Sequence, residues 1–504
     1  MLNFLDRFLR EPFRKVLMRF LILTEKKNKK PVTSRHDTLL QMDIHIPPFL
    51  VAAGCVTSLI LIFLFHFGWY GSTFVSTTLF VLLVLVFFVI YLQNEFPELV
   101  KDDEAMMLLG TLIVFFTTVI VSLKIWNFSF YLTPLAAASI LAALLLHFRI
   151  AIILTLTLTL FFSIVNGFSL HAFVLGFFSG MAGAIVARSI QSHRDFIRAG
   201  ISISVVGSLT QLVFGLWTHF SIPFLFSSIL WIGLSGFISA ILALGLLPFL
   251  ESFFQRVTPM KLQELANFNQ PLLKRLMVEA PGTYHHSLMM ATIAESAANA
   301  IGGNALLCRV GAYYHDIGKL IKPEYFIENQ GGIGFNPHGN IAPALSSLVV
   351  IQHVKEGVSL AKAAKLPQEI INFIPMHHGT SRIEYFYNQA LEVAQEELRL
   401  SDKSMPETEV EEEHYRYPGP RPQTKETAIL MLADSVEAAS RTLEEPTHLR
   451  LKDLVERLVK KKVEDGQLSY TPLTLNDLTQ VQEAFVKTLT SIYHSRIEYP
   501  EDPK

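Results

Sequence analysis

The sequence predicts an all-α protein, with a polytopic helical membrane domain of about eight spans followed by a cytoplasmic all-helical domain. The 504-residue chain is too long for one ordinary domain, and 51% of it is hydrophobic. Residues 51–94, 150–187 and 199–250 contain no Asp, Glu, Lys or Arg, whereas charges recur every few residues after Glu251. This change in composition divides the chain into a membrane domain at 48–250 and a soluble domain at 251–504.

The first part contains apolar runs long enough to cross a bilayer. About 20 apolar residues span the ~30 Å hydrocarbon layer as a helix, and a helix satisfies its own backbone groups in lipid. Glycine, asparagine and proline mark the turns between the runs. The eight predicted spans are residues 48–66, 73–93, 106–124, 130–147, 150–166, 169–189, 197–218 and 223–250.

Basic residues predict the orientation. The first 30 residues carry nine Lys or Arg against three acidic residues, and cytoplasmic segments of membrane proteins are enriched in Lys and Arg. We therefore predict that residues 1–47 form a cytoplasmic, basic, amphipathic segment at the membrane surface. An even number of crossings then returns the chain to the cytoplasm after residue 250.

The second part is predicted to be almost entirely helical. Prolines and glycines divide it into segments whose apolar residues recur with a period near 3.6, and strands are not evident. Residues 401–424 are acidic and then proline-rich, which predicts a mobile loop inside this domain. A net charge of -2 without a basic stripe argues against binding of a nucleic acid polymer.

Histidines and carboxylates recur in the second part in a pattern that suits metal binding. Imidazole and carboxylate donors together favour Fe, Mn, Zn or similar divalent ions, and two cysteines are too few for a thiolate site. Neighbouring residues on a helix diverge by roughly 100°, so adjacent His315 and Asp316 can serve two sides of a site, with Asp316 as a bridge between two ions. Any one of these histidines, taken alone, is more often a hydrogen-bonded core residue. The set is His285, His286, His315, Asp316, His353, His377, His378 and Asp434.

Five motifs in a fixed order resemble one family. They are "APGTYHHSLMMATIAE" (280–295), "VGAYYHDIGKLIKPEYFIENQ" (310–330), "VVIQHVKEG" (349–357), "PMHHGTSRIEYFY" (375–387) and "ADSVEAASR" (433–441). They are similar to those of the seven-transmembrane HD-domain phosphohydrolases, whose characterised members cleave cyclic di-AMP in bacteria. The resemblance covers residues 251 to about 495 by motif, and the membrane region by architecture.

The resemblance implies a site with two divalent ions, Mn²⁺ or Fe²⁺. Asp316 and Lys319 would be the catalytic residues, with Lys319 facing substrate phosphate, and His286 is the ligand of the "HHS" sequence rather than His285. The implied ligands of the first ion are His286, His315, Asp316 and Asp434. Those of the second ion are Asp316, His353, His377 and His378.

The implied function is a phosphodiesterase, anchored in the bacterial cytoplasmic membrane with both termini in the cytoplasm, that hydrolyses cyclic di-AMP to linear pApA. Its partners would be the cyclic dinucleotide and the lipid bilayer, and a homo-oligomer is left open. Members of the family usually carry a large extracytoplasmic domain after their first membrane helix. Here only "GWYGST" and its neighbours join the first two spans, so we expect that sensor domain to be absent.

Three alternatives stay open at this point. The first is an HD hydrolase of another nucleotide, such as a guanosine alarmone or another cyclic dinucleotide, although the sequence after "HHGTSRIEYFY" lacks the glycine-tyrosine-proline signature of the cyclic di-GMP branch. The second is a receptor that binds a nucleotide without cleaving it. The third is a transporter or channel, which is disfavoured because the spans hold few ionisable residues, among them His66 and His171.

Overall fold

The computed structural model describes residues 48–66, 68, 71–330, 337–400 and 410–493. Within these ranges every regular element is a helix, and the β-pairing is limited to one isolated bridge between Arg382 and Arg416. The prediction of an all-α protein is therefore confirmed. The predicted amphipathic segment, residues 1–47, lies outside the described residues.

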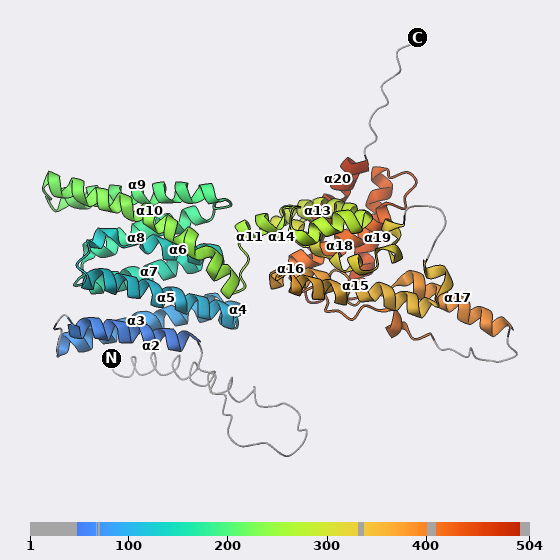
Figure 1. Cartoon of the computed structure of the whole chain (residues 1–504), viewed down its shortest axis with the longest axis horizontal. Helices are drawn as coiled ribbons and strands as arrows, with labels where there is room; N and C mark the ends of the chain where they lie inside the picture. Colours follow the sequence, from blue (N-terminus) through green and yellow to red (C-terminus); the bar gives the residue numbers. More distant parts are fainter. Residues whose placement is uncertain (1–47, 67, 69–70, 331–336, 401–409, 494–504) are drawn as a thin grey trace, which may run out of the picture. The chain divides into compact units, whose positions relative to one another are not determined.

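The membrane part runs through helices α2 to α10 (Figure 1, blue to green). Its elements are α2 (Pro48–His66), α3 (Ser72–Glu95), α4 (Pro97–Val100), α5 (Asp103–Ile125), η1 (Phe130–Leu132), α6 (Leu135–Leu145), α7 (Phe148–Val165), α8 (Leu170–Ala187), α9 (His193–Trp217) and α10 (Ile222–Phe253).

Six of these helices are long and apolar enough to cross a membrane: α3, α5, α7, α8, α9 and α10. They correspond to six of the eight predicted spans. The other two predicted spans coincide with shorter apolar stretches, Ala52–Leu61 within α2 and Phe130–Leu145. The protein is thus a membrane protein whose apolar helices lie where the sequence predicted them.

The prediction of one continuous helix over residues 130–147 is wrong. The chain forms the short helix η1 and then an extended turn at Thr133, whose φ is -69° and ψ is 118°, before α6 begins after Pro134. Proline disfavours the helical conformation of the residue before it, and this explains the break. With 11 residues, α6 is about 16 Å long and is shorter than the hydrocarbon layer.

Small residues let α6 pack closely against its neighbours. Four of its five alanines are buried, and α6 contacts α7, α8 and α10. A Cβ atom added at Gly183 of α8 would lie 2.9 Å from the carbonyl oxygen of Ala136, so glycine is needed there. Close backbone approach at small residues is a general way of joining helices in lipid.

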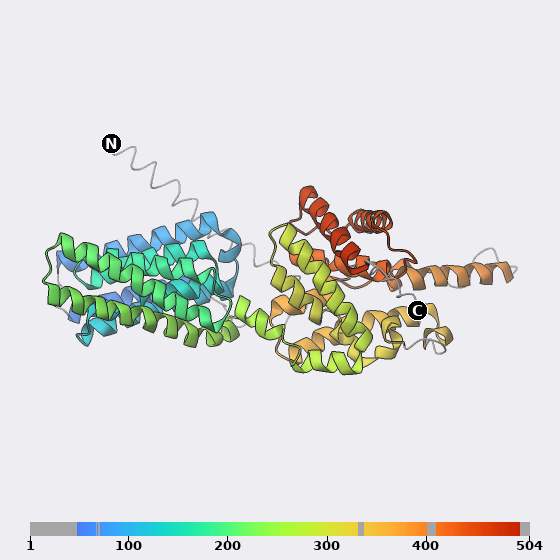
Figure 2. The ribbon, with the colours of Figure 1, turned by 90° about the horizontal axis from the view of Figure 1, so that it is seen from above.

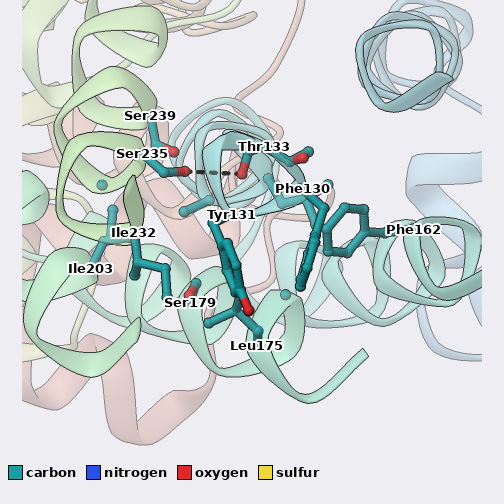
Figure 3. A pocket seen from close by; sticks show the side chains of 14 residues that line it. Phe130, Tyr131, Thr133, Phe162, Leu175, Ser179, Ile203, Ile232, Ser235 and Ser239 are labelled. Atoms are coloured by element: carbon teal, nitrogen blue, oxygen red, sulfur yellow. Dashed lines mark hydrogen bonds between the residues drawn. The ribbon is translucent and has the colours of Figure 1, made fainter. Parts of the chain in front are cut away.

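Hydroxyl groups gather where the chain breaks before α6 (Figure 3). Ser235 of α10 donates a hydrogen bond of 3.1 Å to the carbonyl of Thr133, which also accepts one of 2.9 Å from the backbone nitrogen of Leu135. A cavity of about 20 Å³ adjoins this bond, and Ser179 and Ser239 also line it. This volume suffices for about one water molecule.

A polar network ties four membrane elements together next to this break. The side-chain oxygen of Gln211, in α9, lies 2.6 Å from Nε2 of His171 in α8. The amide nitrogen of Gln211 donates to Ser228 of α10 at 2.8 Å and to the hydroxyl of Tyr131 in η1 at 3.3 Å. His171 therefore belongs to a hydrogen-bonded contact between helices, which is a common role of polar residues in membrane bundles.

The part of the chain after α10 is also helical. Its elements are α11 (Pro259–Leu265), α12 (Pro271–Glu279), α13 (Pro281–Ala300), α14 (Ala305–Tyr314), η2 (Ile317–Ile321), η3 (Pro323–Tyr325), η4 (Ile327–Asn329), η5 (Pro337–Asn340), α15 (Pro343–Ala363), α16 (Gln368–Met376), α17 (Glu384–Leu400), η6 (Glu412–Tyr415), α18 (Lys425–Ser440), α19 (His448–Glu464) and α20 (Leu475–Tyr493).

Helix α13 lies at the centre of this part. It contacts α14, α18 and α20, and both views show α20 beside it (Figure 1 and Figure 2). Fully buried side chains such as Ile293, Phe373 and Phe485 join these helices in one apolar core. The core holds the helix ends that carry the histidines of the site.

The predicted mobile loop is partly wrong. Residues 401–409 lie outside the described residues, but residues 410–424 pack against the domain. Tyr415 and Tyr417 are buried there. Arg416 donates to the carbonyl of Thr380 at 2.8 Å and pairs with Asp465 at 3.1 Å. Buried aromatic residues and long-range ion pairs hold a segment whose local composition is typical of loops.

Candidate metal centre

The seven predicted metal ligands come together in the part of the chain after α10. They form two groups of donor atoms that lie within 4.8 Å of one another in each group. The first group is His286, His315 and Asp316. The second group is His353, His377 and His378. Asp434 of α18 lies between the groups, 3.2 Å from Nε2 of His286 and 3.7 Å from Nδ1 of His378.

Helix ends place most of these side chains. His315 is the last residue in helical conformation after α14, and Asp316 then begins η2. His377 ends α16 in the same way, and Gly379 takes the left-handed conformation with φ of 54°. His286, His353 and Asp434 lie within α13, α15 and α18. The site is therefore carried by helices of the packed core.

A glycine brings the two groups together. Gly318 follows Asp316 by two positions, and a Cβ atom there would lie 1.8 Å from the carbonyl oxygen of His353. Only glycine permits this approach of η2 to α15. The contact places the Asp316 carboxylate against His353, and it explains a glycine inside the "HDIGK" sequence.

Three imidazoles are oriented by their own helices. Nδ1 of His315 lies 2.7 Å from the carbonyl oxygen of Ala312, and Nδ1 of His377 lies 2.7 Å from that of Ile374. Nδ1 of His353 makes the same contact with Val350. Because a carbonyl only accepts, each Nδ1 carries the proton and each Nε2 keeps its lone pair.

Four imidazole Nε2 atoms of the site are buried. Nε2 atoms without a hydrogen-bond partner among the described residues belong to His286, His315, His353 and His377. Oδ1 of Asp316 is also buried and has no hydrogen-bond partner among the described residues. Buried polar atoms without partners are costly, and a metal ion would satisfy them.

Asp316 faces both groups. Its Oδ2 atom lies 3.1 Å from Nε2 of His315, in the first group. Its Oδ1 atom lies 3.4 Å from Nε2 of His353 and 3.6 Å from Nε2 of His377, in the second group. If divalent ions were bound by the two groups, Asp316 is the carboxylate that could contact both.

His286 is oriented by a carboxylate that the sequence analysis missed. Nδ1 of His286 lies 2.6 Å from Oε2 of Glu437, and Arg441 donates to Oε1 of the same carboxylate at 2.7 Å. Glu437 is buried. The sequence does hint at this role. Glu437 follows Asp434 by three positions, so the two carboxylates share one face of a helix.

The neighbouring histidines differ as the sequence analysis expected. His285 is exposed, whereas His286 is 6% exposed and faces the other donors. His338 lies apart from the two groups, with Nε2 2.9 Å from the carbonyl of Tyr325. Burial and orientation therefore favour His286 as the donor in "HHS".

Lys319 is paired on two sides. Its Nζ atom lies 2.7 Å from Oδ2 of Asp316 and 2.7 Å from Oε1 of Glu328, and it stacks over Phe326. Burial alone would lower the pKa of Lys319, but the two carboxylates raise it above the usual value. Glu328 was not predicted, because its pairing depends on the fold of η4.

The two groups differ in charge. Burial, together with nearby cationic groups, lowers the pKa of His377 to about 3. Burial also lowers the pKa of His353 and of His378, so the second group is neutral at pH 7. In the first group, burial opposes protonation of His286, but Asp434 and Glu437 raise its pKa to about 10. Neutral imidazoles and ionised carboxylates together make a donor set that can bind divalent cations.

The chain matches two known families in order. Residues 72–258 match the family of 7TM receptors with an intracellular HD hydrolase, and residues 283–439 match the HD domain. The cyclic-di-AMP phosphodiesterase PgpH of Bacillus subtilis (strain 168) is 38% identical over 382 residues, which are 74% of this chain and 52% of that protein. The protein of the same name from Listeria monocytogenes serotype 1/2a is 32% identical over 434 residues, which are 84% of this chain and 58% of that protein.

A solved structure is also similar to the soluble part. The crystal structure of the L. monocytogenes phosphodiesterase PgpH HD domain in complex with cyclic-di-AMP is 42% identical, covers 45% of this chain and all of that chain, and gives a TM-score of 0.41. The chain spans just over half the length of the curated relatives it matches. With its membrane helices and its HD domain matched in the same order, the chain belongs to the family of seven-transmembrane proteins with an intracellular HD hydrolase domain.

Proposed function

We propose that this protein is a metal-dependent phosphodiesterase that hydrolyses cyclic di-AMP to linear pApA at the cytoplasmic membrane of a bacterium. One observation carries the proposal: four buried imidazole nitrogens, which have no hydrogen-bond partner among the described residues, converge on a carboxylate that faces both histidine groups. The relatives whose names state this activity support the choice of substrate.

The proposed ligands follow the two groups. His286, His315, Asp316 and Asp434 would hold the first ion, and Asp316, His353, His377 and His378 the second. Nitrogen and oxygen donors without thiolates suit Mn²⁺ or Fe²⁺. When bound, two such ions lower the pKa of a water molecule and neutralise the charge that develops on the reacting phosphate.

The protein groups orient these donors and balance their charge. Backbone carbonyls hold His315, His353 and His377 with their Nε2 atoms toward the site, and Glu437 holds His286. Lys319 adds a positive charge beside Asp316, where it would face the phosphate. Water adds to one phosphodiester, the bond from phosphorus to the ribose 3′ oxygen breaks, and the ring becomes a linear dinucleotide.

The proposed orientation places both termini in the cytoplasm. It follows from the basic residues of the N-terminal segment and an even number of crossings. A reporter fused after Lys504 should be cytoplasmic, and one inserted near Gly71 should be external. Reporters on the same side would contradict this orientation.

The decisive experiment uses the full-length protein in detergent with Mn²⁺ or Fe²⁺. It is incubated with cyclic di-AMP, cyclic di-GMP and a guanosine alarmone, and products are separated by chromatography. We expect pApA from cyclic di-AMP and much slower reaction of the others. Turnover of the alarmone alone would show a different nucleotide hydrolase, and binding of cyclic di-AMP without product would show a receptor.

A further inference from the structure

We propose that Lys462 and Ser381 form an anion subsite beside the second histidine group, which takes the phosphate of a cyclic dinucleotide that is not being cleaved. This inference rests on the proposed phosphodiesterase function. It assigns a contact with the substrate to Lys462, which lies on helix α19 and outside the five motifs.

Lys462 is a partly buried cation without a carboxylate partner. Its Nζ atom donates a hydrogen bond of 2.8 Å to the hydroxyl of Ser381. No ion pair within 4 Å is formed by Lys462 with any described residue, although its two neighbours on α19 are paired. Lys461 lies 3.1 Å from Glu384, and Lys460 lies 3.8 Å from Glu464.

The acidic groups around Lys462 are already neutralised by other cations. Asp465 pairs with Arg416 at 3.1 Å and accepts a bond from Gln467 at 2.8 Å. Glu384 pairs with Arg382 at 2.9 Å as well as with Lys461. Lys462 thus keeps a positive charge that no described carboxylate contacts directly.

This charge lies next to the site. Ser381 follows the "HHGT" sequence, and its backbone nitrogen donates to the carbonyl of His378 at 3.0 Å. Asp434, which lies between the histidine groups, is the carboxylate with the largest electrostatic influence on Lys462. Burial lowers the pKa of Lys462, so its ammonium form is poorly solvated and would gain from an anionic ligand.

The loop that carries Ser381 is held in place. Oε1 of Gln467 accepts a bond from the backbone nitrogen of Thr380 at 3.0 Å, and Arg421 donates to the Thr380 hydroxyl at 3.0 Å. Arg416 donates to the carbonyl of Thr380 at 2.8 Å. A subsite on such a loop is ordered before the ligand arrives, which reduces the entropy lost on binding.

The chemical class of the ligand follows from the number of phosphates in the proposed substrate. The histidine groups would act on one phosphodiester, and a cyclic dinucleotide carries a second phosphodiester in the same ring. Lys319 lies beside Asp316 and is assigned above to the phosphodiester that is cleaved, so the second phosphate needs another cation. Lys462, with its unpaired charge and the Ser381 hydroxyl beside it, is suited to an anion.

The test compares a substrate with two phosphates and a substrate with one. Full-length wild-type protein and the Lys462→Gln variant are assayed on cyclic di-AMP and on bis(4-nitrophenyl) phosphate. We expect the variant to raise KM for cyclic di-AMP by roughly 10- to 100-fold, since bonds to charged groups are among the strong ones. Its rate on bis(4-nitrophenyl) phosphate, its metal content and its melting temperature should match wild type.

Lys461→Gln is the matched control, because it removes the neighbouring charge from an exposed, paired residue and should leave KM unchanged. An equal loss on both substrates, or a lower melting temperature with Lys462→Gln, would overturn the subsite and leave Lys462 as a support of the Ser381 loop. An unchanged KM for cyclic di-AMP would also overturn it.

A binding measurement separates this proposal from the proposed function. The affinity for fluorescent cyclic di-AMP is measured for wild type and for Lys462→Gln, without turnover. If wild type binds but does not cleave, the phosphodiesterase proposal fails, and a weaker affinity of Lys462→Gln still supports the subsite. If wild type does not bind the cyclic dinucleotide, the subsite is overturned as well.

Discussion

The two histidine groups of the site are held in place by different means. In the second group, His353 and His377 bond to carbonyls three residues earlier in their own helices. In the first group, His286 depends on Glu437, which lies 151 residues away along the chain. His353 and His377 of the second group are therefore oriented by local helix geometry, whereas His286 of the first group also requires long-range packing and paired charges. The first group should be the more sensitive to substitution of its surroundings.

Asp316→Asn should have the largest effect, because Asp316 faces both groups. We expect both ions to be lost and the rate on cyclic di-AMP to fall by more than about 10³-fold. Elemental analysis of the full-length protein, together with product chromatography, measures this. His285→Ala, which changes an exposed neighbouring imidazole, should keep both ions and most of the activity. One fully retained ion in Asp316→Asn would show that the two groups do not share this carboxylate.

Lys319→Ala tests whether charge beside the first group acts on substrate rather than on metal. We expect two ions per chain to remain, while kcat/KM for cyclic di-AMP falls by roughly 10² to 10³. Metal content and steady-state kinetics are measured on the same preparation. Loss of an ion would instead show that Lys319 positions Asp316, which its 2.7 Å contact with Oδ2 would explain.

Glu437→Gln tests whether the two groups depend on different surroundings. Loss of a carboxylate that orients a metal-binding histidine typically weakens metal affinity by roughly 10- to 100-fold. Since Glu437 contacts only His286 among the proposed ligands, one ion should weaken and the other should not. Competition with a chelator measures the two affinities. Equal weakening of both ions would remove the distinction between the groups.

Proton release on metal binding should be the smallest of these effects. The pKa of His286 is about 10, so the imidazole is protonated at pH 7.5 and must lose its proton to bind an ion. Affinity for this ion should therefore fall by about tenfold for each pH unit below the pKa. Calorimetry in buffers of different ionisation enthalpy should detect about one proton released in wild type and fewer in Glu437→Gln. No release in wild type would show that His286 is already neutral.

Much of the site could be predicted because its donors stand in short, ordered motifs. All the imidazoles of the two groups stand in these motifs, and His286, the predicted donor of "HHS", is buried whereas His285 is exposed. The positions of the membrane helices could be predicted from the length of the apolar runs alone. Both kinds of signal are local in the chain.

The features that escaped prediction depend on contacts between distant segments. Glu328 pairs with Lys319 through the fold of η4, and Glu437 reaches His286 through the packing of α18 on α13. Tyr417 is buried, although the composition around it is that of a loop. The break before α6 is an exception, since Pro134 lies within the predicted span 130–147 and disfavours a helical conformation at Thr133.

The position of α18 late in the chain has a consequence for biosynthesis. Asp434 and Glu437 leave the ribosome after all the imidazoles of the two groups have been made. A nascent chain that ends before α18 therefore carries the histidines but lacks the helix that orients His286 and closes the space between the groups. Domains generally fold as units, and metal affinity adds to the stability of the folded form. If the proposed ions bind, we expect their capture to follow the synthesis of α18.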